Sequence, residues 1–549
     1  MSGTSSEGDT PVLLEIRDLI IEGRSEDTWS PIVKGVDLTL HREQVLGLIG
    51  ESGAGKSTIG LAAMGFARDG CRISGGDIRF DGIALREIGE GRLRRLRGAR
   101  IAYVAQSAAA SFNPARRIDD QVCETAVQHG IMSRSEARKR ARKLYETLRL
   151  PDPDTFGRRF PHQVSGGQLQ RAMVAMALVC GPDLIVFDEP TTALDVTTQI
   201  EVLAAIKDAI RQERAAALYI THDLAVVGQI ADRIKVLLQG EEVEEGDTEQ
   251  ILYHPKEDYT TKLVKVRSVS KPGHTDMSRI PAIEARHVTA AYGKGLKVLD
   301  DVSVSVGRGS TTAIVGESGS GKSTLARVMT GLLPPMAGGC HLDGVELPAQ
   351  LRHRTKDQLR RLQMIYQMPD VAVNPRQMID EIIGRPLTFY FGTTGRKRRD
   401  RVAELLELVE LSPDLAKRPP AALSGGQKQR ICIARALAAE PDVVICDEVT
   451  SALDQVVADG VLKLLLRLQR EFQTSYVFIT HDLATVRAIA DDVAVMYLGQ
   501  VVEHGAKDDI LNNPRHDYTK KLLSSVPRME MGWLDRVLAE RAKGREAIS

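Results

Sequence analysis

The strongest constraint on this 549-residue chain is that its second half repeats its first half. Four segments recur in the same order, and they share most of their residues. They are GESGAGKST (50–58) and GESGSGKST (316–324); VSGGQLQR (164–171) and LSGGQKQR (423–430); LIVFDEPTTALD (184–195) and VVICDEVTSALD (443–454); YITHDLA (219–225) and FITHDLA (478–484). Solenoid repeats span only about 20–50 residues, so a period this long indicates a duplicated domain.

The spacing of matching residues predicts the domain boundaries. Residues 188 and 447 are 259 apart, whereas residues 56 and 322 are 266 apart, so insertions and deletions fall in the front half of each copy. We predict a disordered N-terminus at 1–11, domains at 12–264 and 282–527, a linker at 265–281 and a tail helix at 528–549. The linker contains Pro and Gly and lacks apolar periodicity. The tail carries Trp533, Leu534, Val537 and Leu538 at helical spacing, and we expect it to pack on the domain that it follows.

Each copy begins with an apolar strand pattern, a glycine-rich loop and a helical pattern, which together predict a phosphate-binding loop. Glycines let successive backbone N–H groups point at phosphates, and the helix N-terminus adds a positive dipole. We expect Lys56 and Lys322 to reach the β- and γ-phosphates, and Ser57 and Ser323 to place a hydroxyl on Mg²⁺. The expected nucleotide-binding residues are Gly50, Glu51, Ser52, Gly53, Ala54, Gly55, Lys56, Ser57, Thr58, Gly316, Glu317, Ser318, Gly319, Ser320, Gly321, Lys322, Ser323 and Thr324.

A second apolar strand in each copy ends in Asp-Glu. A carboxylate at the end of a buried parallel strand lies at the carboxyl edge of the sheet, where α/β folds bind ligands. Asp188 and Asp447 therefore suit Mg²⁺, and Glu189 and Glu448 suit the polarisation of an attacking water. A pair of helix-capping acids is the alternative, and four preceding apolar residues argue against it.

The SGGQ element, which lies 23 residues before this Asp in both copies, resembles that of the ATP-binding-cassette family. The resemblance implies an α/β fold of two P-loop cassettes in tandem, each with a RecA-like core and a helical subdomain. It also implies that SGGQ opens a helix and faces the γ-phosphate held by the opposite domain, so that Ser424 and Gly426 complete the first site and Ser165 and Gly167 the second. The nucleotide-binding residues implied in this way are Ser165, Gly166, Gly167, Gln168, Ser424, Gly425, Gly426 and Gln427.

The same resemblance assigns further roles. Gln106 and Gln367 would sense Mg²⁺ and the attacking water, and so join Ser57, Asp188, Ser323 and Asp447 as metal-site residues. The residues implied to be catalytic are Glu189, Glu448, His222, His481, Gln106 and Gln367. Asp195 and Asp454 resemble the loop through which cassettes communicate. Each THD follows an apolar strand and lies 34 residues after the metal-site Asp.

One position differs between the copies. The family places an adenine-stacking aromatic ring where Tyr292 stands, whereas alignment of the two copies puts Gly23 at that position in copy one. Trp29 is a candidate substitute. We therefore expect two chemically equivalent sites that can differ in affinity.

Other segments resemble the dipeptide/oligopeptide permease ATPases, in the fused form found in mycobacteria. SFNPARRI (111–118) and AVNPRQMI (372–379) resemble their NP segment, and HPKEDYTTKL (254–263) and NPRHDYTKKLLSSVP (513–527) resemble their HPxxxYT element. The implied partners are two multispanning permease subunits and an extracytoplasmic substrate-binding protein, with this chain peripheral at the cytoplasmic face of the membrane. The N-terminal segment lacks signal-peptide features, and the longest apolar run (172–180) is too short for a span.

Composition limits the alternatives. The net charge is zero and CxxC is absent, so we expect no nucleic acid partner, no zinc and, with no cysteine in the linker or tail, no iron–sulfur cluster. A fused sugar-import ATPase, a soluble cassette protein acting on ribosomes or DNA and a regulatory nucleotide sensor remain alternatives. The expected cofactors are ATP and Mg²⁺.

Overall fold

The computed structural model describes residues 11–25, 28–192, 194–265, 271, 280–293, 295–451 and 453–546. The chain divides into two compact units, which comprise residues 1–265 with 527–549, and residues 266–526. Most of the N-terminal segment at 1–11 and of the linker at 265–281 lies outside the described residues.

The first unit is built on a six-stranded sheet in the order β10-β9-β3-β8-β7-β6. Its strands are β3 (Val45–Gly50), β6 (Ile101–Val104), β7 (Leu184–Asp188), β8 (Ala216–Ile220), β9 (Arg233–Leu238) and β10 (Glu241–Asp247). Only β10 runs antiparallel to its neighbour among these strands. Every residue of β3, β7 and β8 is buried, as expected for parallel strands covered on both faces.

A second, antiparallel sheet in the same unit has the order β2-β1-β4-β5. Its strands are β1 (Val12–Ser25), β2 (Thr28–His41), β4 (Cys71–Phe80) and β5 (Ile83–Ala84). Alternating residues such as Leu14, Ile16, Leu38 and Leu40 join one apolar cluster with β3 and the helix that follows it. This period of two is typical of a sheet with a single buried face.

The second unit repeats this plan strand by strand. Its sheets have the orders β16-β17-β18-β13-β19-β20 and β12-β11-β14-β15. The strands are β11 (Ile283–Ala291), β12 (Lys297–Val306), β13 (Thr311–Val315), β14 (Ala337–Leu342), β15 (Val345–Glu346), β16 (Leu362–Ile365), β17 (Val443–Asp447), β18 (Ser475–Ile479), β19 (Asp492–Tyr497) and β20 (Gln500–Ala506). The expected duplicated α/β fold is confirmed.

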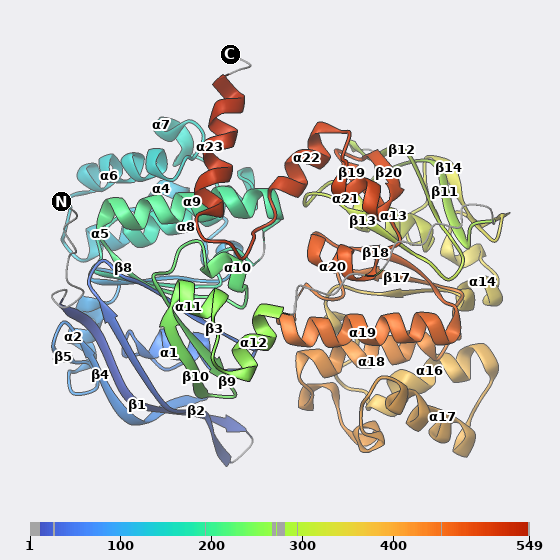
Figure 1. Ribbon diagram of the computed structural model, residues 1–549, viewed down its shortest axis with the longest axis horizontal. Coiled ribbons are helices and arrows are strands. Elements are labelled where there is room, and N and C mark those ends of the chain that lie inside the picture. Colours follow the sequence, from blue (N-terminus) through green and yellow to red (C-terminus); the bar gives the residue numbers. More distant parts are fainter. Residues whose placement is uncertain are drawn as a thin grey trace. The chain divides into compact units, whose positions relative to one another are not determined.

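Helices complete each unit. Helices α6 (Arg134–Thr147) and α17 (Gly395–Leu408) pack against α8 (Gly166–Leu178) and α18 (Gly425–Leu437), respectively. Figure 1 shows α19 (Gln455–Phe472) running alongside α18 in the second unit, as α9 (Val196–Glu213) does alongside α8 in the first. No helix within the described ranges is long and apolar enough to cross a membrane.

The C-terminal tail belongs to the first unit, which corrects the expectation that it packs on the domain it follows. Leu534 of α23 (Trp533–Glu546) is fully buried, and its backbone N–H donates to Oε1 of Gln229 at 3.1 Å. The Gln229 amide in turn donates to the carbonyl oxygens of Arg528 and Glu530. The expectation failed because the helical spacing of the tail shows that one face is apolar but not which surface covers it.

Candidate active site

The glycine-rich loop connects β3 to α1 (Lys56–Ala62) in the first unit and β13 to α13 (Lys322–Met329) in the second. Gly55 and Gly321, the residues that precede these helices, have φ of 88° and 102°, which favours glycine. A Cβ on Gly55 would lie 2.8 Å from Cγ2 of Val33, so the loop also needs glycine for close packing against β2. Both loops therefore have the backbone conformation that the motif predicts.

The loop lysines are folded back into their own loops. Nζ of Lys56 donates to the carbonyl oxygens of Gly50 and Glu51, both at 2.8 Å. Nζ of Lys322 makes the same two bonds, with Gly316 and Glu317. Each ammonium group is thus held at the mouth of the loop, where a phosphate cradled by the loop amides would accept hydrogen bonds from it.

The serine after each lysine meets the aspartate at the end of the second strand. Oγ of Ser57 donates to Oδ1 of Asp188 at 2.8 Å, and Oγ of Ser323 donates to Oδ1 of Asp447 at 3.1 Å. Burial raises the pKa of Asp447 above its ordinary value, and the Glu448 carboxylate adds to this, while the Ser323 hydrogen bond opposes it. The expected metal-site oxygens therefore lie together in both units.

A Gln, a Glu and a His converge beside each aspartate. In the first unit, Nε2 of Gln106 donates to Oε2 of Glu189 at 3.0 Å, and Nδ1 of His222 lies 3.2 Å from Oε1 of Glu189. In the second unit, the corresponding distances from Gln367 and His481 to Glu448 are 2.6 and 3.4 Å. The three residues come from segments up to 116 positions apart (106 to 222), so their convergence depends on the fold.

In each Glu–His pair, the two residues shift one another's pKa in the directions that favour opposite charges. Burial alone would raise the pKa of Glu189, but the hydrogen bond and charge of His222, with the charge of Lys56, place it below its usual value. Burial would likewise lower the pKa of His222, but Glu189 outweighs burial and raises it. Glu448 and His481 show the same shifts for the same reasons. The lowered pKa favours the ionised form of each carboxyl, which is able to accept a proton from water.

The backbone at these glutamates is strained. Glu189 and Glu448 both have φ of 49°, in the left-handed region that L-residues other than Asn and Asp rarely adopt. The N–H of Glu189 donates to the carbonyl of Ile220, and that of Glu448 to the carbonyl of Ile479, so the neighbouring strand holds each in place. Such strain persists where the surroundings over-determine a residue's position, commonly at active sites.

The SGGQ segments open α8 and α18, as expected. Oγ of Ser165 accepts from the backbone N–H of Gln168, and Oε1 of Gln168 accepts from the N–H of Ser165, which forms a reciprocal cap. Ser424 and Gln427 form the same cap. The remaining N–H groups at each helix start, and the positive end of its dipole, are available to an anion.

The second glycine of each SGGQ is required for helix packing. A Cβ on Gly167 would lie 2.1 Å from Cγ2 of Thr198 on α9, whereas one on Gly166 would meet nothing within 4 Å. Asp195, expected to take part in communication, caps α9 through the backbone N–H of Thr198 at 3.0 Å. Asp454 caps α19 through the N–H of Val457 in the same way.

The position of the expected adenine-stacking ring differs between the units. Tyr292 is 46% exposed, and its Oη accepts from Nη1 of Arg327 at 2.9 Å. Gly23 takes the matching place, and a Cβ there would lie 2.6 Å from Cδ1 of Ile32, which fills the space of the absent side chain. Trp29 lies on β2 with the guanidinium of Arg72 4.2 Å from its ring centroid.

Two tyrosines at these sites were missed by the sequence reasoning. The backbone N–H of Glu317 in the second glycine-rich loop donates to Oη of Tyr518 at 2.8 Å. Tyr103 on β6 donates to Oδ2 of Asp188 at 2.6 Å. Tyr518 was missed because it lies 201 positions from Glu317 in the sequence. Tyr103 was missed because its sequence context is that of a core residue in an apolar strand. The one sequence feature that distinguished Tyr103 from other core residues was its replacement by Met364 at the corresponding position of the second copy.

Within the described ranges, no three His, Cys, Asp or Glu side chains cluster in a way that would hold a metal ion. The paired Ser and Asp oxygens do fit Mg²⁺, which prefers oxygen ligands and takes most of them from waters and substrate phosphates rather than from a protein cage.

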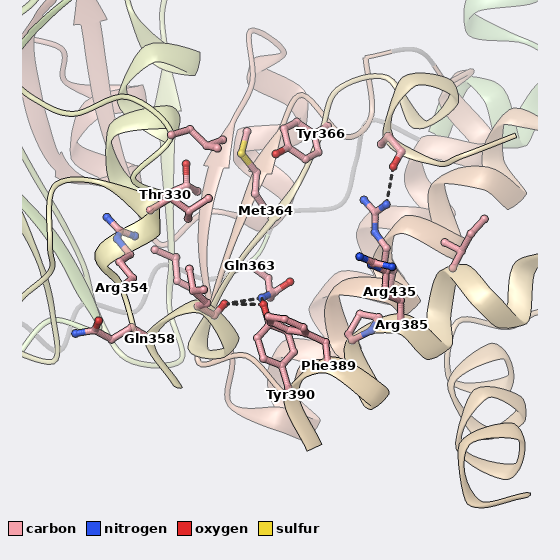
Figure 2. A pocket seen from close by; sticks show the side chains of 17 residues that line it. Thr330, Arg354, Gln358, Gln363, Met364, Tyr366, Arg385, Phe389, Tyr390 and Arg435 are labelled. Carbon is pink, nitrogen blue, oxygen red and sulfur yellow. Dashed lines mark hydrogen bonds between the residues drawn. The ribbon is translucent and has the colours of Figure 1, made fainter. Parts of the chain in front are cut away.

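A cavity of about 440 Å³ opens in the second unit. Figure 2 shows that its lining joins the core of the unit, through Met364 and Tyr366, to the helical region, through Phe389 and Arg435. Nη1 of Arg435 donates to the carbonyl of Ala372 in the NP segment at 2.6 Å. Exposed apolar side chains gather in this part of the unit, including Met368, Val371 and Phe389, at 57%, 78% and 52% exposure.

Comparison with known proteins gives two family matches. The model described as "ABC transporter" matches residues 33–192 and 299–451. The model described as "Oligopeptide/dipeptide transporter, C-terminal region" matches residues 502–548.

Among full-length relatives, the glutathione import ATP-binding protein GsiA of Escherichia coli O6:H1 is 37% identical, over 96% of this chain and 91% of its own. GsiA of Salmonella choleraesuis is 38% identical, over 95% and 91%. A solved structure of cbiO1 from Clostridium perfringens, described as part of the ABC transporter complex cbiONQ, is 27% identical with a TM-score of 0.40, and covers 43% of this chain and 92% of its own.

Proposed function

This chain belongs to the ABC transporter family, and we propose that it hydrolyses ATP at one site in each unit to power peptide import through a membrane permease. The observation that carries the proposal is the Gln–Glu–His cluster beside the glycine-rich loop, which occurs in full in both units. Neither copy is degraded, so we propose two hydrolytic sites.

The protein groups have separate tasks in this reaction. The loop amides and Lys56 would hold the phosphates, and Ser57 and Asp188 would hold Mg²⁺, which would neutralise charge on the transferred phosphoryl group. Glu189 accepts a proton from the attacking water, since His222 and Lys56 lower the pKa of its carboxyl and so favour the ionised form. Gln106 fixes the orientation of that carboxylate through its 3.0 Å hydrogen bond. Lys322, Ser323, Asp447, Glu448 and Gln367 take the same roles in the second unit.

His222 and His481 hold the second oxygen of each glutamate. The raised pKa of both imidazoles favours their protonated, positively charged form. We propose that this charge also stabilises the γ-phosphate. That each SGGQ helix start serves the nucleotide of the other copy remains a proposal from the family resemblance.

Peptide cargo is supported by the C-terminal segment and by the relatives. Residues 502–548 match the oligopeptide/dipeptide transporter family, and the full-length relatives are named for glutathione import. The matched segment includes Tyr518, which contacts the second loop directly through the N–H of Glu317. The cargo-specific family signature thus contains a residue of the nucleotide site.

Membrane attachment in this proposal is through two permease subunits that bind this chain at the cytoplasmic face of the membrane, with an extracytoplasmic substrate-binding protein delivering the cargo. The cavity in Figure 2 and its apolar surroundings supply a docking surface in the second unit. A permease helix inserted there would contact both the β16 strand and the helical region. A movement of one relative to the other would therefore displace that helix.

The experiment is to reconstitute the chain in proteoliposomes with its two permease subunits and binding protein, and to measure ATP-dependent peptide uptake. We expect uptake that requires both ATP and Mg²⁺ and that is lost when Phe389→Asp and Val371→Asp disrupt the docking surface. Arg396→Asp, a change at an exposed residue of α17 outside the cavity lining, is the control and should leave uptake unchanged. Recovery of the chain with ribosomes, and no association with permeases, would overturn the transport function.

A further inference from the structure

Both oxygens of the Asp188 carboxylate are held by side chains of the first unit. Oδ1 accepts from Oγ of Ser57 at 2.8 Å, and Oδ2 accepts from Oη of Tyr103 at 2.6 Å. The second distance lies in the range of a charge-assisted O–H···O⁻ bond, which is about twice as strong as a neutral one. With both oxygens engaged, the carboxylate cannot rotate about its Cβ–Cγ bond without losing a hydrogen bond.

The phenol is rigidly supported. Tyr103 lies on β6, which pairs in parallel with β7 so that Tyr103 stands beside Val186, two positions before Asp188. Its ring packs against the apolar cluster formed by β1, β2, β3 and the helix after the loop. The hydroxyl is therefore placed by the core of the unit and not by a loop.

Among the described residues of the second unit, no tyrosine takes this position. β16 pairs with β17 in the same register as β6 with β7, and this puts Met364 beside Ile445, at the position of Tyr103. A thioether has no proton to donate. Among the described residues, the Asp447 side chain accepts one hydrogen bond, from Ser323 at 3.1 Å. Met364 instead lines the cavity of Figure 2.

We propose that Tyr103 is a positioning residue for the metal site of the first unit, and that Met364 leaves the second unit without one. The inference rests on the proposed role of Ser57 and Asp188 in holding Mg²⁺. A carboxylate already fixed in its ligating orientation loses less freedom on metal binding. The first site therefore fills with metal and nucleotide at a lower free metal concentration than the second site.

The test uses the full chain with one site disabled. In a Lys322→Ala background, the first site is titrated with Mn²⁺ in the presence of a saturating non-hydrolysable ATP analogue, and free Mn²⁺ is followed by electron paramagnetic resonance. Nucleotide affinity is measured in parallel in EDTA. We expect Tyr103→Phe, which keeps the packed ring, to raise the half-saturating Mn²⁺ concentration about tenfold and to leave the affinity in EDTA unchanged.

A reciprocal variant distinguishes the loss of the Tyr103 hydroxyl from a general effect of misfolding. In a Lys56→Ala background, Met364→Tyr should lower the half-saturating Mn²⁺ concentration of the second site. An unchanged Mn²⁺ titration in both variants, or an equal loss of nucleotide affinity in EDTA for Tyr103→Phe, would overturn the role of Tyr103 and leave the nucleotide sites standing. Absence of any metal-dependent nucleotide binding in the two backgrounds would overturn the proposed function itself.

Discussion

Nδ1 of His222 lies 3.2 Å from Oε1 of Glu189, and the two half-buried side chains meet just after the end of β7. The same relationship recurs between His481 and Glu448 at 3.4 Å. The carboxylate that we assign to water activation raises the pKa of each histidine and so favours its protonated form. The charge of the histidine and the basicity of the glutamate are therefore linked, and a change in one residue alters the other.

The first prediction concerns this linkage. Replacing Glu189 with Gln removes the hydrogen bond and charge that raise the pKa of His222, and leaves burial as the largest effect, which lowers it. We expect the imidazole of His222 to titrate above about 6.5 in the native chain and below it in Glu189→Gln. Nuclear magnetic resonance of the labelled histidine side chains measures both values. Glu448→Gln, which leaves the His222 titration unchanged, is the matched control.

The pH dependence of stability follows with a definite sign. Because the pKa of His222 is raised in the folded state, its contribution to stability is present below the unfolded value and is lost as pH rises through the folded value. The stability difference between the native chain and Glu189→Gln should therefore shrink as the pH rises through the folded pKa of His222. A difference that grows with pH would contradict the protonation state assigned here.

A second prediction separates the two adjacent glycines of SGGQ. Gly167→Ala forces a Cβ to within 2.1 Å of Thr198 and should push α8 from α9, which lowers stability by about 1–3 kcal/mol. Gly166→Ala meets nothing within 4 Å and should be neutral or slightly stabilising. Chemical denaturation of the two variants measures the contrast. Equal stabilities would show that α8 and α9 are less closely packed than the structure has them.

A third prediction concerns the asymmetric adenine position. With the first site disabled by Lys56→Ala, Tyr292→Ala should weaken ATP binding at the second site about tenfold, since loss of aromatic stacking on a base costs about 1–3 kcal/mol. Equilibrium binding of a fluorescent ATP analogue measures the change. Trp29→Ala in the same background is the control and should have no effect on this site. Unchanged affinity in Tyr292→Ala would mean that this ring does not contact the base.

A fourth prediction tests the packing of the tail. Leu534 is fully buried on the first unit, and Leu534→Ala should destabilise that unit by about 2–5 kcal/mol. Asp535→Asn breaks only the exposed pair with Lys207 and should cost less than about 1 kcal/mol. Hydrogen exchange of the amides around Gln229 reports on the first unit alone. Faster exchange confined to the second unit would contradict the assignment of the tail.

Most of the fold and most of the residues that meet at each candidate site could be predicted from the sequence, for a physical reason. The loop, the Asp-Glu strand end and the THD segment each follow an apolar strand, and parallel strands bring their carboxyl ends to one edge. Gln106, Glu189 and His222 could therefore be expected to lie close together, as they do. Their chemical roles remain proposals.

The packing of the tail and the contacts of Tyr103 and Ile32 could not be predicted, because they depend on which surfaces of the folded chain meet. The apolar face of α23 fits any complementary surface, and nothing in its spacing indicates α9 and Gln229. Tyr103 looks like a strand residue until the register of β6 on β7 places its hydroxyl on Asp188. Ile32 closing the space beside Gly23 likewise depends on a cross-strand neighbour nine positions away.

The central claim is that both units hydrolyse ATP with the carboxylates of Glu189 and Glu448. Its most direct test is the steady-state rate of ATP turnover in Glu189→Gln, in Glu448→Gln and in the double variant. We predict a reduced rate in each single variant and a loss of about a hundredfold or more in the double variant, with ATP still bound. Glu146→Gln, an exposed residue of α6, should turn over ATP at the native rate. A double variant that hydrolyses ATP as fast as the native chain would contradict the account.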